Sequence, residues 1–146
     1  MLSFMKMLNN ISRSQAIYRN SRITASDLNS CHYAFVISIC RKPGRSQEEI
    51  ARDLCLNKST VARALNSLET NGYILRTPLP NDKRQFSVHP TEKMLGVLPK
   101  VRKASAEWRD QLSEDIPEEE MEIFNSVLER MERRARDIIE SQEAVK

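Results

Sequence analysis

The chain has 146 residues, a formal net charge of +3 and 29% charged residues. This length suits one domain with one modest hydrophobic core. Aromatic residues make up only 5% of the chain and there are three glycines, which argues against a β-sandwich or barrel with many turns. The composition therefore predicts a mostly α fold, and the mildly basic charge permits nucleic-acid binding without requiring it.

Hydropathy and cysteine content indicate a cytoplasmic protein that does not contact a membrane. The longest apolar run, 33–40, is far shorter than the roughly 20 residues that a membrane span needs, and the N-terminus does not resemble a secretion signal. Cys31, Cys40 and Cys55 cannot all pair, which favours reduced thiols. With two histidines and no cysteines at zinc-like spacing, we expect no metal and no cofactor.

Two helices are predicted before residue 41. Apolar residues at helical spacing indicate an amphipathic helix over 2–18, and the polar residues 20–22 are expected to end it. Thr24 or Ser26 can cap the next helix, which should run to about Cys40. That helix is apolar on nearly all sides near its end, so we expect it in the middle of the core.

Two shorter helices follow, and both have recognisable ends. Ser46 and Glu49 form a capping box, which predicts a helix start. Asn57 can cap a second helix that runs to about Thr70. Gly72 can then adopt the left-handed conformation that often follows the last helical turn.

The remaining chain is expected to form a hairpin and two long helices. Short strands are predicted at 73–77 and 85–88, joined by a polar turn at 80–84. Pro99 should kink the helix that follows or shift its start to its second half. The last helix starts at Pro117, and its apolar stripe consists of Met121, Phe124, Leu128, Met131, Ala135 and Ile138.

Helix, short turn, helix and hairpin in this order are typical of a winged helix-turn-helix. The second helix has a polar outer face that can enter a major groove about 12 Å wide. On that face Arg63 has the planar guanidinium that reads guanine, and Asn66 can pair with a base edge. In the wing, Lys83 and Arg84 supply positive charge, and Asp82 is expected to hold the Arg84 guanidinium.

The chain resembles the MarR family of transcriptional regulators over nearly its whole length, most specifically in the segments Leu54–Arg63, Leu68–Ile74, Asn81–Arg84 and Thr91–Lys93. The resemblance implies a single domain, 1–146, with a winged helix-turn-helix lobe at 23–98 and dimerisation helices at 1–22 and 100–146. Two departures from the family pattern are Pro90 before Thr91 and Met94 at a position where the family usually has glycine.

The resemblance also implies how such a protein works. We expect a homodimeric repressor that binds a near-palindromic DNA duplex and is released by a small aromatic or phenolic ligand. The expected DNA-binding residues are Ser46, Gln47, Lys58, Ser59, Thr60, Arg63, Asn66, Arg76, Asp82, Lys83 and Arg84. The expected ligand-binding residues are Tyr18, His32 and Phe35.

Two other classes of function remain to be weighed. A winged helix can serve as a protein–protein adaptor that never binds DNA, because a fold does not fix a function. The basic, polar second helix argues against this alternative, since an adaptor surface would more often be apolar there. An enzyme is disfavoured, because the sequence has no phosphate-cradling glycine loop and no catalytic pair in a context that suggests activation.

Overall fold

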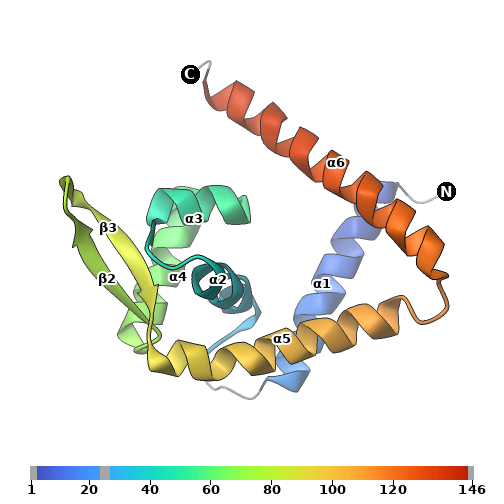
Figure 1. The fold of residues 1–146 in the computed structure, drawn as a ribbon, viewed down its shortest axis with the longest axis horizontal. Helices are drawn as coiled ribbons and strands as arrows, with labels where there is room; N and C mark the ends of the chain where they lie inside the picture. The colour runs from blue at the N-terminus through green and yellow to red at the C-terminus, as the bar shows by residue number, and fades with distance from the viewer. Residues whose placement is uncertain (1–2, 24–26, 145–146) are drawn as a thin grey trace. The chain divides into compact units, whose positions relative to one another are not determined.

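The computed structural model describes residues 3–23 and 27–144, and within these ranges it contains six α-helices and one small antiparallel sheet (Figure 1). The mostly α prediction with a hairpin wing is confirmed. The described residues up to Trp108 form one compact unit, and those from Arg109 onward form a second. In chain order the elements are α1 Phe4–Arg22, α2 Ser30–Arg41, β1 Arg45–Ser46, α3 Gln47–Leu54, α4 Lys58–Thr70, β2 Ile74–Leu79, β3 Asp82–Pro90, α5 Glu92–Leu112 and α6 Glu118–Glu143.

Helix α2 lies in the middle of the first unit, as its apolar sequence predicts. It packs against α1, α3, α4 and β3, and Figure 1 shows it nearly end-on. Its buried side chains meet those of the surrounding elements in one core. The largest fully buried members of this core are Tyr33, Phe35, Val36, Ile39, Ile50, Val61, Leu65, Leu68, Tyr73, Ile74, Val88 and Met94. Apolar burial of this kind is the main term that stabilises the fold.

The ends of α1 and α2 differ from the prediction. The polar residues 20–22 do not end α1, which continues to Arg22; polar residues without glycine or proline are compatible with a helix. Thr24 and Ser26 lie outside the described residues, and α2 is capped instead by Asn29, whose Oδ1 accepts the Cys31 N–H at 3.0 Å. Asn29 is a preferred N-cap residue one turn before the apolar run at 33–40, so this cap could have been found from the sequence.

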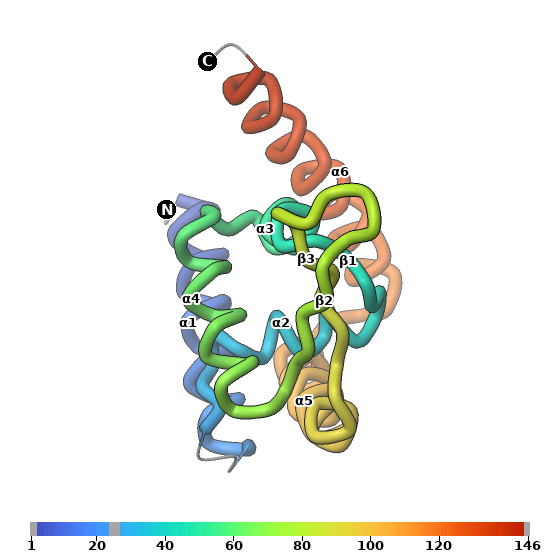
Figure 2. Tube along the Cα trace, turned by 90° about the vertical axis from the view of Figure 1, so that its left-hand side faces the viewer, coloured from blue at the N-terminus to red at the C-terminus, as the bar shows by residue number. Residues whose placement is uncertain are grey.

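The sheet has three strands in the order β1-β3-β2, and Figure 2 shows the hairpin and the short β1 beside it. The predicted hairpin strands are too short, because the turn takes only Pro80 and Asn81 and the basic residues continue β3. Strand β2 extends through Pro78, which lies at a register irregularity in an edge strand, where a missing N–H is tolerated. Strand β1 was not predicted, since a two-residue strand has no periodicity to detect.

Helix α5 runs without interruption through Pro99, so the alternative that Pro99 shifts the start of the helix is wrong. Pro99 is exposed, and water can satisfy the backbone carbonyl that its ring leaves without an N–H. The helix begins after Thr91, whose hydroxyl donates to Gly72 O at 2.7 Å. Met94, at the position where the family usually has glycine, is fully buried in the core.

A buried arginine holds the first unit together at the corner between α2, β1 and α3. Arg45 is only 8% exposed, and its Nη2 donates to the Ser38 carbonyl at 2.6 Å. Its Nη1 lies 3.1 Å from Oδ2 of Asp53, which also accepts the Ser38 hydroxyl at 2.5 Å. Burial raises the pKa of Asp53, but the hydrogen bonds from Ser38 and Arg45 outweigh it, and the net pKa lies below its usual value.

Replacing this carboxylate should destabilise the fold in a pH-dependent way. Asp53→Asn leaves the Arg45 charge buried without its counter-ion, which should cost about 3 kcal/mol of unfolding free energy at pH 7. Because the folded pKa of Asp53 is lowered, its stabilisation is complete above about pH 4 and is lost as the pH falls through the folded value. Urea denaturation at several pH values from 7 to 3 should therefore show that the difference in unfolding free energy between wild type and variant becomes smaller as the pH falls.

The matched control is Asp110→Asn, which removes an exposed carboxylate paired with neighbouring Arg109. An exposed pair of this kind contributes about 0–1 kcal/mol. Equal effects of the two substitutions would contradict the structural role assigned to Asp53.

Candidate nucleic-acid interface

Helix α4 begins where the sequence predicts. Oδ1 of Asn57 accepts the Thr60 N–H at 2.8 Å and the Ser59 hydroxyl at 2.9 Å, which satisfies donors that the first helical turn leaves open. The inward side of the helix is buried in the core. At the other end Gly72 has φ +77°, the left-handed conformation expected there. These local interactions set where α4 begins and where it ends.

The outward side of α4 presents the polar face that the sequence predicts. Ser59, Arg63 and Asn66 are exposed, whereas Thr60 is half-buried. Arg63 has no hydrogen bond or ion pair with any residue in 3–23 or 27–144. Lys58 is exposed and pairs with Glu48 of α3 at 3.2 Å. The face therefore offers one unengaged guanidinium, between a hydroxyl and an amide one turn away on either side.

The N-terminus of α3 lies next to the sheet. Ser46 Oγ accepts the Glu49 N–H at 3.2 Å, and Glu49 Oε2 accepts the Ser46 N–H at 2.8 Å, so the predicted capping box is confirmed. This bond from the Ser46 backbone is the main reason why the pKa of Glu49 is lowered. A hydrogen bond with the Ser46 side chain lowers the pKa of Glu49 further, and the half-buried Gln47 follows Ser46.

The wing carries the predicted basic residues, but one contact differs. Asp82, Lys83 and Arg84 are all exposed. Asp82 Oδ1 accepts the backbone N–H of Arg84 at 3.0 Å, not its guanidinium. A carboxylate two residues before an N–H commonly closes such a local ring. The predicted ion pair between Asp82 and the Arg84 guanidinium is therefore wrong. The guanidinium is left unengaged within the described part of the chain.

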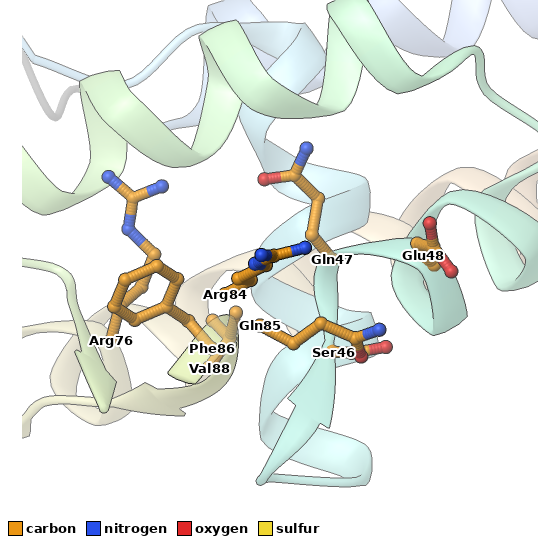
Figure 3. Close-up of a pocket in the computed structure, with 8 residues that line it drawn as sticks. All are labelled: Ser46, Gln47, Glu48, Arg76, Arg84, Gln85, Phe86 and Val88. Carbon is orange, nitrogen blue, oxygen red and sulfur yellow. The ribbon is translucent and has the colours of Figure 1, made fainter. Parts of the chain in front are cut away.

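A cavity of about 190 Å³ lies between the wing and the start of α3, and Figure 3 shows the side chains that line it. Ser46, Gln47 and Glu48 line it from α3, and Arg76, Arg84 and neighbouring wing residues line it from the sheet. The structure therefore brings the predicted residues of α3 and of the wing to one hollow. Its composition, the unengaged Arg84 guanidinium beside the N-terminus of α3, suits a phosphate group.

Arg76, predicted as a DNA-binding residue, is engaged with α4. Its Nε and Nη2 donate to Glu69 Oε2 at 3.0 and 2.5 Å, and its Nη2 also donates to Asn66 Oδ1 at 2.8 Å. The Arg76 hydrogen bonds lower the pKa of Glu69. Sequence analysis missed Glu69, because no local pattern relates residues on a helix and a following strand.

A second and larger cavity, of about 600 Å³, lies between α1, α2 and α4. His32 and Phe35, two of the three predicted ligand-binding residues, line it. Tyr18 does not: its ring lies 5.3 Å from that of Trp108, and its hydroxyl faces Glu107 at 3.5 Å. Two residues of α4, Thr60 and Arg63, are also part of the lining.

Two polar side chains of this cavity have unusual surroundings. Nε of Arg19 is buried without a hydrogen-bond partner among the described residues, and burial lowers the Arg19 pKa. Nδ1 of His32 accepts the Asn29 N–H at 3.3 Å, so the neutral ring carries its proton on Nε2. Burial also lowers the His32 pKa, which favours this neutral form. Arg19 was missed because its spacing on α1 is that of an ordinary solvated residue.

The three cysteines are free thiols. Cys31 and Cys55 are exposed, and burial raises the pKa of the half-buried Cys40. Within the described ranges, no group of three His, Cys, Asp or Glu side chains could hold a metal ion. No helix in the same ranges is long and apolar enough to cross a bilayer.

Comparison with known proteins agrees with this geometry. The sequence profile of the MarR family matches residues 28–86. The chain is 30% identical over 105 residues to an uncharacterized HTH-type transcriptional regulator, YybA, from Bacillus subtilis (strain 168), covering 72% of this chain and 70% of that protein. It is 31% identical over 97 residues to the HTH-type transcriptional regulator BilQ of Clostridium symbiosum, covering 66% and 67%.

Solved structures show the same fold. A MarR transcriptional regulator from Methanosarcina mazei Go1 superposes with a TM-score of 0.86 at 27% identity, covering 92% of this chain and 97% of that one. A MarR-family regulator from Listeria monocytogenes, solved in complex with a 26mer DNA, has a TM-score of 0.87 at 22% identity, covering 94% and 91%. The sequence matches and the helix-turn-helix with its wing lead to one conclusion: this chain belongs to the MarR family and is a DNA-binding transcriptional regulator, not an enzyme.

Proposed function

We propose that this regulator is a homodimeric repressor that reads a near-palindromic duplex with α4 and the wing and leaves DNA when a small organic acid binds. The observation that supports the DNA contacts is the polar face of α4, where Arg63 is exposed between Ser59 and Asn66. Such a helix enters the major groove, and an unengaged guanidinium there reads guanine in a bidentate manner.

The other contacts follow from position and charge. Lys83 and Arg84 on the wing reach the adjacent backbone or minor groove as cations. Gln47 at the start of α3 can donate to a phosphate in the hollow that Arg84 also lines, and Ser46 lines the same hollow. Lys58, Ser59, Thr60 and Asp82 complete the proposed interface: the first three lie in the first turn of α4, and Asp82 orients the backbone of Arg84.

Substitutions on α4 and on the wing should weaken DNA binding in different ways. Arg63→Ala should cost about 1–3 kcal/mol on the preferred duplex and relax specificity at one base pair. Lys83→Ala should weaken all duplexes alike and reduce the slope of log K against log salt by roughly one. Fluorescence anisotropy at several salt concentrations, with DNA from upstream of the protein's own gene and a scrambled duplex, measures both effects.

The control for these variants is Lys100→Ala, which removes an exposed cation of α5 and should leave both parameters unchanged. If Arg63→Ala and Lys83→Ala bind as Lys100→Ala does, the assignment of the DNA-contacting face is wrong. A protein that binds no duplex even at low salt would instead support the adaptor alternative.

The dimer is supported by apolar helix faces that no residue in 3–23 or 27–144 covers. No residue of α6 is buried, and Ile123 is 67% exposed. Most of the predicted stripe is exposed as well, including Phe124, Met131 and Ile138. On α1, Ile17 is 72% exposed and four other large apolar residues are exposed too. Apolar surface of this extent is typical of a subunit interface, which supports the proposed dimerisation helices at 1–22 and 100–146.

Charges placed in the stripe should therefore separate the subunits. The double variant Phe124→Glu and Met131→Glu is expected to be a monomer at micromolar concentration, whereas the wild type is a dimer, because burying four carboxylates per dimer is unfavourable. Sedimentation equilibrium measures the masses. Arg133→Gln, on the opposite side of α6 from Met131, is the control and should remain dimeric. A wild type that is monomeric at tens of micromolar would refute the proposal.

Ligand release is supported by the larger cavity and its unpaired guanidinium. Phe35, Leu54 and Leu56 supply apolar walls, and the Arg19 Nε–H has no acceptor among the described residues. A buried donor without an acceptor is costly, and an organic acid with an apolar body would satisfy it. Because Arg63 also lines the cavity, a ligand there contacts the helix that meets DNA, which couples the two binding events.

The proposed role of Arg19 predicts that the cavity prefers organic acids to neutral alcohols, and that removal of Arg19 abolishes this preference. Titration calorimetry with benzoate- and phenylacetate-type acids, each compared with its neutral alcohol, should show preference for the acid. Arg19→Met should weaken acid binding by tenfold or more, since a charged hydrogen bond contributes about 1.5–3 kcal/mol, and DNA affinity without ligand should not change. Arg22→Met, which removes the exposed arginine stacked on Tyr18, is the control. Equal affinity for acids and alcohols would contradict the proposed ligand class.

A further inference from the structure

Arg76 connects the wing directly to the DNA-facing side of α4. It lies on β2 and reaches two residues one turn apart on the helix, Glu69 and Asn66. Three of its five N–H groups are used: Nε–H and one Nη2–H on Glu69 Oε2, and the other Nη2–H on Asn66 Oδ1 at 2.8 Å. Glu69 neutralises its charge, so Arg76 is poorly suited to be a free cation for phosphate.

This contact fixes how the Asn66 amide is turned. A guanidinium has donors only, so the atom of Asn66 that faces Arg76 must be the carbonyl oxygen. The amide nitrogen then points the other way, and Asn66 is exposed on the outward face of α4. The groups of Asn66 that point away from Arg76 are therefore its two N–H donors, while one lone pair of its oxygen accepts from the Arg76 guanidinium.

We propose that Arg76 determines which base edge Asn66 reads. An asparagine pairs with adenine by accepting from N6 and donating to N7, which needs both ends of the amide. With its oxygen turned towards Arg76, Asn66 presents its N–H donors to the groove and favours an edge rich in acceptors, which is N7 and O6 of guanine or O4 of thymine. Arg76 is thus a positioning residue for specificity. This inference depends on the proposed contact between the outer face of α4 and DNA.

The test is a selection of bound duplexes from a random pool, followed by anisotropy on matched duplexes that differ at one base pair. The loss of preference in Asn66→Ala identifies the base pair that Asn66 reads. At that pair the wild type should select guanine or thymine. Arg76→Met frees the amide oxygen, and the preference should shift towards adenine by about tenfold in relative affinity.

Two further variants separate positioning from charge and from folding. Arg76→Lys keeps the charge but lacks the fork that binds Glu69 and Asn66 together, so it should also shift the preference towards adenine. Arg41→Met removes an exposed arginine that pairs with Asp53 outside α4 and should keep the wild-type preference. Thermal unfolding of each variant checks that the selections are made on folded protein.

The outcomes are distinct. A shift towards adenine in both Arg76 variants, with Arg41→Met unchanged, supports the inference. If Asn66→Ala removes a preference for guanine or thymine but the Arg76 variants keep it, the positioning role is refuted and the DNA face stands. A wild type that selects adenine at that pair refutes it as well. If Asn66→Ala changes no preference at any base pair, Asn66 reads no base and the inference is refuted together with the proposed Asn66 contact.

Discussion

The compact unit up to Trp108 depends on one buried charge, the guanidinium of Arg45. A cation that is 8% exposed is tolerated only when its N–H groups meet acceptors and a counter-ion is in contact. Ser38 and Asp53 meet these requirements from two different helices, α2 and α3. Arg45 is also in β1, which pairs with β3. The Arg45 side chain therefore connects α2 and α3 to the sheet.

This constraint extends to the surface that we propose to meet DNA. The residue after Arg45 is Ser46, which caps α3 and lines the hollow beside the wing. Arg76 makes a second connection, from β2 to the last turns of α4. The ion pairs of Arg45 and Arg76 thus connect the start of α3, helix α4 and the wing to one another. A DNA reader needs this rigidity, because a base contact is selective only when the side chain is already placed.

Helix α4 borders two regions with different chemistry. Its outward side carries Ser59, Arg63 and Asn66 towards solvent, and Thr60 and Arg63 also line the larger cavity beside α1 and α2. Arg63 is common to both regions, and Arg19 lies across the cavity from α4 on α1. If α4 meets DNA as proposed, a ligand in this cavity and a DNA duplex would address the same guanidinium, which is a physical basis for the proposed mutual exclusion.

The sequence by itself determined the features that arise from neighbours along the chain. The capping box of Ser46 and Glu49, the Asn57 cap, the turn at Gly72 and the exposed face of α4 all follow from interactions within four residues. Only the tertiary structure decided the contacts between distant residues: Arg45 with Asp53, Arg76 with Asn66, the unpaired Nε of Arg19, and the packing of Tyr18 on Trp108. The physical reason is range, because periodicity and caps report a residue's own turn of helix, whereas a buried charge finds its partner only after the core has formed.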